Sequence, residues 1–285
     1  MIKKEEFTIL GKHSKRILID IRFEESHSKK PLIIFCHGFK GFKDFGCFNL
    51  IADFFAMNGF VFLKFNFSHN GTTPEFPIDF VDLKAFSKNT FMIELDDLEC
   101  VIDNIYNSKN ELLNKNIDAQ NITLIGHSRG GGIALLKAFD DRRIKNLITW
   151  ASVNKFGNFW SDEVILKWKN EGIRYELNGR TKQNMPMSYR IYEDLEENTL
   201  KLDIPFAIKN LQKPYLIVHG ENDETIKVGI ALEIKNWNNN AELIIINGTN
   251  HTFDGKHPWE TSQMPKKTLE LVTKSLLFLN SLKNI

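Results

Sequence analysis

A serine between two glycines marks the first residues that could carry chemistry. From Ile122 to Gly132 the chain reads Ile-Thr-Leu-Ile-Gly-His-Ser-Arg-Gly-Gly-Gly. Gly126 and Gly130 would let a strand and a helix meet in a sharp turn that holds the Ser128 hydroxyl clear of the backbone. The free N–H groups of that helix favour negative charge there. A serine with a glycine two residues before it and another two residues after it occurs by chance in about one chain in ten of this length. The prediction that Ser128 is a nucleophile therefore depends on the position of this motif between an apolar strand and a helix.

A serine hydroxyl needs a base to take its proton, and the base needs a carboxylate to orient it. Residues that directly follow parallel strands meet at one edge of a sheet, and both Asp223 and His251 follow late strands. We therefore expect Ser128, Asp223 and His251 to form a catalytic triad in that chain order. Lower-ranked histidines are His257, His37, His127 and His219, and lower-ranked acids are Asp203, Asp162, Asp254, Glu221 and Glu224.

Attack by serine creates a negative oxygen that needs at least two N–H donors already in place. One donor is expected to be the backbone N–H of Arg129, the residue after the nucleophile. The other is expected to be the backbone N–H of Phe39, which follows His37-Gly38 at the end of an earlier strand. The Arg129 side chain is expected to face solvent or to pair with an acid of the inserted segment described next, without a catalytic role.

Alternating strands and helices are expected to position these residues in an α/β fold with a mostly parallel central sheet flanked by helices. Strands are expected at 5–10, 16–25, 32–36, 60–67, 122–125, 144–153, 214–220 and 242–246, and helices at 49–58, 90–108, 133–139, 227–237 and 266–283. The acidic residues of the second helix are interpreted as a solvated face and not as a metal site; they are Glu94, Asp96, Asp97 and Glu99.

The alternation breaks between residues 154 and 211, where the chain becomes polar and irregular. Helices are expected there at 162–170 and 189–198, with a hairpin near 173–187 through Asn178-Gly179. We interpret 154–211 as an inserted lid over the crevice of a core made of 1–153 and 212–285. Its aromatic and methionine residues, with one tryptophan beyond it, are equally suited to a ligand pocket or to the insertion's own core: Trp160, Trp168, Met185, Met187, Tyr189, Tyr192 and Trp259.

Composition limits the partners. The 285 residues are 42% hydrophobic, and 37 Lys and Arg nearly balance 36 Asp and Glu. A neutral chain has no global field that would draw it to nucleic acid or to an anionic membrane, so a small molecule is the expected partner. Three cysteines at no metal-like spacing argue against disulfides or zinc, and no cofactor is expected. The first residues include no long apolar segment, which predicts a cytoplasmic protein.

Four motifs in this order resemble the α/β-hydrolase superfamily. His37-Gly38-Phe39 is similar to its oxyanion loop and Gly126–Gly130 to its nucleophile elbow. His219–Asp223 is similar to its acid loop, and Asn247–His251 to its histidine loop. Within the superfamily the chain resembles cinnamoyl or feruloyl esterases and dienelactone-hydrolase-like esterases, which carry a lid in the place of 154–211. True dienelactone hydrolases have a cysteine nucleophile, so that resemblance does not imply their substrate.

The motifs and the resemblance together predict a serine hydrolase that cleaves carboxylic esters of small, medium or aromatic acyl groups through an acyl-enzyme. Thioesterase, lactonase and amidase or peptidase activities remain open, because they use the same triad. A ligand-binding protein without activity also remains open, because a fold does not determine a function. Lids of similar proteins can pack against a second subunit, so a homodimer is left open as well.

Overall fold

An eight-stranded sheet lies at the centre of the computed structural model, which describes residues 1–157 and 160–282. The strand order is β1-β2-β4-β3-β5-β6-β9-β10. The pairs β1–β2 and β2–β4 are antiparallel and the other neighbours are parallel. The strands are β1 (Ile2–Leu10), β2 (Arg16–Glu24), β3 (Lys30–Cys36), β4 (Val61–Phe65), β5 (Ile117–His127), β6 (Ile144–Trp150), β9 (Tyr215–Gly220) and β10 (Glu242–Ile246). The expected mostly parallel sheet is confirmed.

Apolar side chains alternate between two cores, one on each face of the sheet, because successive residues of a strand point to opposite faces. Leu124 and Ile217 belong to one core, whereas Ile125 and Leu216 belong to the other. Both sets are fully buried, so the continuous apolar runs of the parallel strands are explained by helices on both faces.

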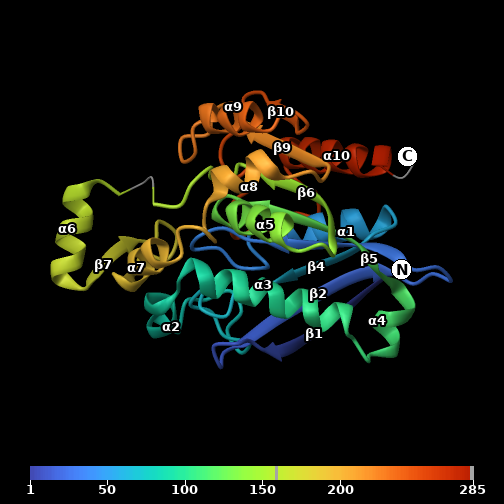
Figure 1. The fold of residues 1–285 in the computed structure, drawn as a ribbon. Coiled ribbons are helices and arrows are strands. Elements are labelled where there is room, and N and C mark those ends of the chain that lie inside the picture. Colours follow the sequence, from blue (N-terminus) through green and yellow to red (C-terminus); the bar gives the residue numbers. More distant parts are fainter. Residues whose placement is uncertain (158–159, 283–285) are drawn as a thin grey trace.

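Helices cover both faces of the sheet, as Figure 1 shows. One face packs against α1 and α10, and the other against α3, α5, α8 and α9. The helices of the core are α1 (Phe48–Met57), α2 (Leu83–Lys88), α3 (Phe91–Tyr106), α4 (Glu111–Asn116), α5 (Arg129–Asp140), α8 (Ile204–Asn210), α9 (Val228–Trp237) and α10 (Lys266–Ser281). Lys283, the last residue of the expected final helix, lies outside the described residues.

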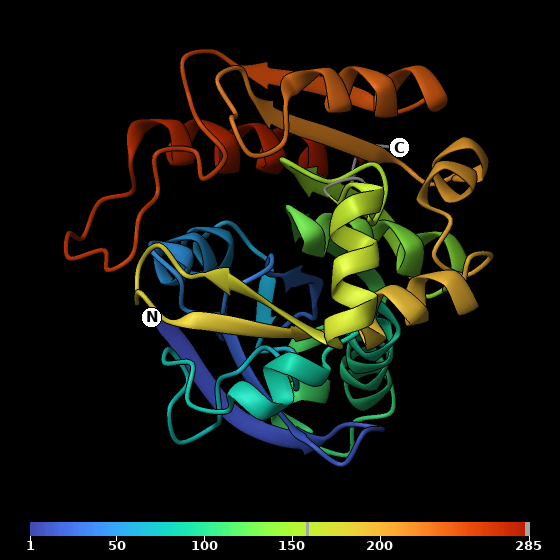
Figure 2. The same ribbon diagram turned by 90° about the vertical axis from the view of Figure 1, so that its left-hand side faces the viewer.

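The segment between β6 and β9 adds a separate hairpin and two helices, and we call it the insertion. It holds α6 (Asp162–Glu171), β7 (Ile173–Leu177), β8 (Asn184–Ser188) and α7 (Arg190–Glu197) before α8 rejoins the core against α5. The expected hairpin is confirmed, with Asn178 N–H donating to the Gln183 carbonyl at 2.8 Å. In Figure 1 the insertion lies at one end of the sheet, away from the chain termini, and in Figure 2 it lies in front of the sheet.

Three short helices, α2, α4 and α8, depart from the expected elements. Each begins at an Asp or Asn whose side chain accepts from a first-turn backbone N–H: Asp82, Asn110 and Asp203. Such caps stabilise helices too short to show a clear apolar period. Among the described residues, no helix is both long and apolar enough to cross a lipid bilayer.

Candidate active site

Ser128 occupies a strained turn between β5 and α5. Its φ of 57° and ψ of −123° lie outside the regions that side-chain-bearing residues favour. A Cβ on Gly126 would lie 2.6 Å from Cα of Gly131, and one on Gly130 would overlap the carbonyl groups of Cys36 and His37. Only glycine fits at both positions, which explains the spacing of the motif around Ser128.

The structure brings Ser128, His251 and Asp223 together in one line of contacts. His251 Nε2 lies 3.0 Å from Ser128 Oγ, and His251 Nδ1 lies 2.7 Å from Asp223 Oδ2. A carboxylate can only accept a hydrogen bond, so the network assigns the imidazole proton to Nδ1 and leaves Nε2 to accept from the serine hydroxyl. The loop after β9 supplies Asp223, and the loop after β10 supplies His251.

Asp223 is held as a buried carboxylate. Its Oδ1 accepts from the backbone N–H groups of Thr225 and Ile226, each at 2.8 Å. Burial opposes its ionisation, but contacts with His219 and His251 outweigh burial and hold the pKa of the Asp223 carboxyl well below its usual value. His219 Nε2 donates to the Ile226 carbonyl at 2.7 Å and also lies 3.3 Å from Asp223 Oδ2. Sequence reasoning gave His219 a packing role and missed this contact.

The backbone around the two expected oxyanion donors converges on Ser128. A Cβ on Gly38 would lie 3.0 Å from Cβ of Ser128, so the loop that carries Phe39 passes directly beside the serine. Arg129 is the first residue of α5, where N–H groups have no intrahelical acceptor. In the described part of the chain, neither the Phe39 nor the Arg129 N–H has a protein acceptor. Both groups are therefore available to a ligand oxygen.

The Arg129 side chain corrects an expectation. It neither faces solvent nor pairs with an acid of the insertion, but forms a buried two-pronged ion pair with Glu94 of α3, with distances of 2.6 and 3.1 Å. Its guanidinium also stacks on the rings of Phe39 and Phe91, with centroids at 5.1 and 4.8 Å. Arg129 thus joins α3 to the loop that carries Phe39.

The acidic residues of α3 are likewise not one solvated face. Glu94 and Asp97 are buried, whereas Asp96 and Glu99 are half-buried and pair with Lys12. Asp97 accepts from the backbone N–H of Ser68 at 2.7 Å, and its burial raises the pKa of Asp97 to about 7. Glu94 and Asp97 lie on the apolar side of the helix, so the interpretation as a solvated face is wrong for these two.

The lower-ranked histidines have other contacts. His37 Nδ1 donates to the Gly38 carbonyl at 2.9 Å, and its Nε2 accepts from Phe67 N–H at 3.3 Å. Burial lowers the pKa of His37 to about 4 and that of His127 to about 3, so both are neutral at pH 7. His127 Nε2 donates to the carbonyl of His251 at 2.9 Å, and His257 accepts from Gly46 N–H.

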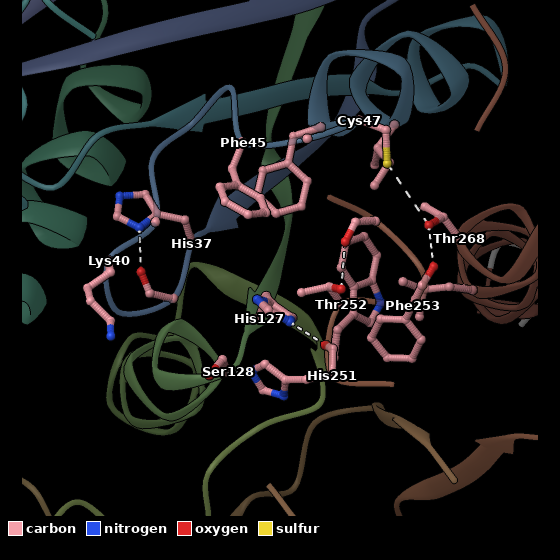
Figure 3. A pocket seen from close by; sticks show the side chains of 18 of the residues that line it. His37, Lys40, Phe45, Cys47, His127, Ser128, His251, Thr252, Phe253 and Thr268 are labelled. Carbon is pink, nitrogen blue, oxygen red and sulfur yellow. Dashed lines mark hydrogen bonds between the residues drawn. The ribbon is translucent and has the colours of Figure 1, made fainter. Parts of the chain in front are cut away.

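Two cavities meet at Ser128. The first, which we call the inner cavity, has a volume of about 170 Å³ and lies between the loops that carry Phe39 and His251. Figure 3 shows Ser128 and His251 at one edge of the inner cavity and Cys47 and Thr268 at another. The second, the outer cavity, has a volume of about 260 Å³ and lies between the core and the insertion. Ser128 and Phe39 line both cavities.

Some aromatic and methionine residues of the insertion line a cavity, and others form the insertion's own core; the sequence left both roles open. Trp160 and Met187 line the outer cavity. Trp168 is buried in the insertion's own core, where its Nε1 donates to the Met187 carbonyl at 2.8 Å and its ring packs against Trp160. Trp259 lies elsewhere, with Nε1 donating to the Gln263 carbonyl.

The described residues include no group of three or more His, Cys, Asp or Glu that could hold a metal ion. The site instead contains an aligned serine, histidine and carboxylate, with the serine at a sharp strand–helix turn. A mostly parallel sheet with helices on both faces, and this turn after its fifth strand, define an α/β hydrolase.

Comparison with known proteins places the chain within that class. The BD-FAE family matches residues 19–237, and the chain belongs to this family. Similar solved structures include Est1E from Butyrivibrio proteoclasticus, with a TM-score of 0.65, 19% identity and 98% of each chain covered. Est1E with ferulic acid bound gives a TM-score of 0.67 at 19% identity, covering 95% of this chain and 96% of that one.

The α/β hydrolase GrgF from a Penicillium species shares the same fold, with a TM-score of 0.71, 16% identity and 98% of each chain covered. A search of curated proteins finds no match. The expected α/β-hydrolase fold and the expected membership among esterase-like hydrolases are confirmed, and the protein is a hydrolytic enzyme.

Proposed function

We propose that the protein is a serine esterase that cleaves carboxylic esters of small, medium or aromatic acyl groups. Ser128 attacks the ester carbonyl, His251 takes the serine proton and passes it to the leaving alcohol, and Asp223 orients the imidazole and stabilises its charged form. The backbone N–H groups of Phe39 and Arg129 hold the negative oxygen. Water then releases the acyl group by the reverse sequence.

The observation that carries the proposal is the line of contacts from Ser128 Oγ through His251 to Asp223, at 3.0 and 2.7 Å. The strained φ of Ser128 adds support, because strain of this kind is retained where it positions a reacting group. Esters are favoured because Est1E, which shares this fold, has been solved with ferulic acid, the acid half of an aromatic ester.

We further propose that 154–211 acts as a lid. The outer cavity lies between the core and this segment, and hydrogen bonds join the two parts. Lys40 Nζ donates to the Leu177 carbonyl at 3.2 Å, and Met92 N–H donates to Asp194 at 3.1 Å. A segment that closes a cavity beside the nucleophile would exclude water from the acyl group.

Replacement of Ser128 tests the proposed mechanism. Ser128→Ala is expected to lower turnover of p-nitrophenyl acetate and butyrate by at least about ten-thousand-fold. Its thermal unfolding is expected to match that of the parent, and a fluorophosphonate probe should label only the parent. Ser281→Ala, at the far end of α10, is the matched control and should keep parental activity and labelling. Equal hydrolysis or labelling of Ser128→Ala and the parent would remove Ser128 from the mechanism.

The same panel separates the reaction classes. A butyryl thioester, a butyryl anilide and γ-butyrolactone are measured beside the ester, because the same triad can cleave all four. We expect the ester to give the highest kcat/KM. An anilide or thioester that exceeded the ester would move the assignment to that class while leaving the triad in place.

A further inference from the structure

The inner cavity lies on the side of Ser128 where the leaving group must depart. In the proposed reaction the bond from Ser128 Oγ to the acyl carbon forms, and the bond from that carbon to the alcohol oxygen breaks. The proton taken from Ser128 passes from His251 Nε2 to the departing oxygen, which must therefore lie beside His251. His251 lines the inner cavity, whereas the residues that line the outer cavity do not include it.

Apolar side chains form most of the inner cavity wall. They come from the loops after β3 and β10, from the end of β6, and from α1 and α10, and include Phe45, Phe48, Ile51, Trp150, Phe253 and Leu271. A cavity of roughly 150 Å³ lined by apolar side chains is known to bind benzene. At about 170 Å³, the inner cavity has room for one aromatic ring or a short alkyl chain.

The threonine and tryptophan side chains of this wall already have partners within the protein. Thr268 Oγ1 donates to the Phe253 carbonyl at 2.7 Å, and Thr252 Oγ1 donates to the Gly255 carbonyl at 2.6 Å. Trp150 Nε1 donates to Ser275 Oγ at 3.1 Å. A sugar or glycerol hydroxyl that entered here would lose its water without gaining equivalent hydrogen bonds, which is costly.

The charged residues of the inner cavity also favour an uncharged group. Among the described residues that line the inner cavity there is no carboxylate, and Lys40 is the one lysine or arginine. Lys40 Nζ is already bound to the Leu177 carbonyl and lies 5.4 Å from the centroid of the Phe39 ring. The described lining therefore offers no carboxylate to a cationic alcohol, and its one lysine is held at the rim by a carbonyl of the insertion.

We propose that the inner cavity receives the leaving group, and that this group is an uncharged apolar alcohol of about the size of benzyl alcohol. The acyl group then occupies the outer cavity beneath the insertion. This inference rests on the proposed esterase function. It divides the substrate between two cavities and places its apolar alcohol on the side of His251, between α1 and α10.

Butyrate esters of methanol, benzyl alcohol and glycerol test the proposal, because these alcohols have similar acidity and differ in size and polarity. The parent is expected to favour the benzyl ester over the glyceryl ester by at least about tenfold in kcat/KM, through burial of the ring. Equal values, or a preference for the glyceryl ester, would overturn the proposal.

Filling each cavity in turn distinguishes their roles. Cys47→Leu, in the inner cavity, is expected to lower the benzyl-to-methyl ratio of kcat/KM by about tenfold. Met187→Phe, in the outer cavity, is expected to change the ratio of hexanoate to acetate esters and to keep the parental benzyl-to-methyl ratio. Ser281→Ala should keep both ratios. If Cys47→Leu changed only the acyl ratio and Met187→Phe only the alcohol ratio, the two assignments would be wrong.

If Cys47→Leu does not fold, a variant that widens the inner cavity provides the test. Leu271→Ala is expected to shift the preference from the benzyl to the naphthylmethyl ester, and an unchanged preference would count against the proposal. Failure of the esterase function and failure of the alcohol assignment give different results. If the parent hydrolyses no ester and escapes fluorophosphonate labelling, the esterase function itself is wrong. If the parent hydrolyses esters and is labelled, but its kcat/KM does not depend on the alcohol of the ester, only the role of the inner cavity is wrong.

Discussion

The imidazole of His219 lies fully buried with its Nε2 3.3 Å from Oδ2 of Asp223. This is the same carboxylate oxygen that faces His251 Nδ1 at 2.7 Å, so two imidazoles share one buried acceptor. His219 Nε2 also donates to the Ile226 carbonyl, which keeps its proton on the side of Asp223. We therefore expect His219 to act on the candidate triad through Asp223, as a positioning residue.

Replacement of His219 by phenylalanine keeps a ring on β9 but removes its N–H. A hydrogen bond to a buried charged group contributes about 1.5 kcal/mol, so we expect kcat/KM for p-nitrophenyl butyrate to fall by about tenfold. Because His219 helps to hold the pKa of Asp223 low, the variant should also lose activity at a higher pH than the parent when the solution is acidified.

Tyr215→Phe is the matched control for His219→Phe. Tyr215 is also buried on β9, and its hydroxyl is 2.9 Å from Thr149 Oγ1, so its loss removes a buried hydrogen bond away from Asp223. It should leave the pH dependence of kcat/KM unchanged. The positioning role would be wrong if His219→Phe and Tyr215→Phe gave the same pH profile.

The second prediction concerns the close packing of the turn around Ser128. Gly126→Ala is expected to destabilise the protein severely, because its methyl group would overlap the backbone of Gly130 and Gly131, which cannot move without breaking α5. Gly229→Ala is the control, since nothing lies within 4 Å of the added carbon, and it should stabilise α9 by about 0.5 to 1 kcal/mol. Thermal unfolding of both variants measures the effect, and a folded Gly126→Ala with parental stability would contradict it.

Much of the fold could be predicted because buried parallel strands produce continuous apolar runs between glycine turns. The same logic located Ser128, Asp223 and His251, since each follows a strand and the carboxyl ends of parallel strands share one edge. Their catalytic roles stay a prediction. The short helices were missed because six or seven residues show no clear period, although Asp203 followed by Ile204-Pro205 is a recognisable helix start.

The buried charges of α3 were missed for a different reason. Residues 94, 98, 101 and 105 recur at helical spacing, and all four are buried. A glutamate on an apolar stripe requires a buried partner, but the partner Arg129 lies 35 positions away, and helical periodicity carries no information about so distant a contact. Asp97, three residues after Glu94, was misread in the same way.

The ion pair of Glu94 and Arg129 leads to a third prediction. Glu94→Gln leaves the Arg129 charge buried without a counter-charge, and we expect it to lower the free energy of unfolding by about 3 kcal/mol. The double variant Glu94→Leu with Arg129→Met should recover most of that loss, because two apolar side chains need no partner. Its esterase activity should nevertheless stay below that of the parent, because the guanidinium that packs on Phe39 is gone.

Urea unfolding at pH 7 and turnover of p-nitrophenyl butyrate measure the two effects separately. Glu197→Gln is the control, because Glu197 and Arg190 form the same kind of two-pronged pair on the exposed surface of α7. Solvent screens such a pair, so its loss should change stability little. If the double variant were as unstable as Glu94→Gln, the cost would not arise from the unpaired charge.

Asp97 makes stability depend on pH in a defined direction. Its burial raises its pKa from 3.8 to about 7 in the folded protein, so the folded state holds the proton more tightly than the unfolded chain does. Stability is therefore unaffected by this group below about pH 4, where both states are protonated, and falls as the pH rises towards 7. Asp97→Asn removes the charge and keeps an oxygen for the Ser68 N–H.

We expect Asp97→Asn to be more stable than the parent by a few kcal/mol at pH 8 and about equal to it at pH 4, in urea unfolding at both pH values. Asp96→Asn, on the half-buried side of the same helix turn, should show no such gain at pH 8. If Asp97→Asn were less stable than the parent at pH 8, the Asp97 carboxylate would be a stabilising ion and its burial would not be the dominant influence.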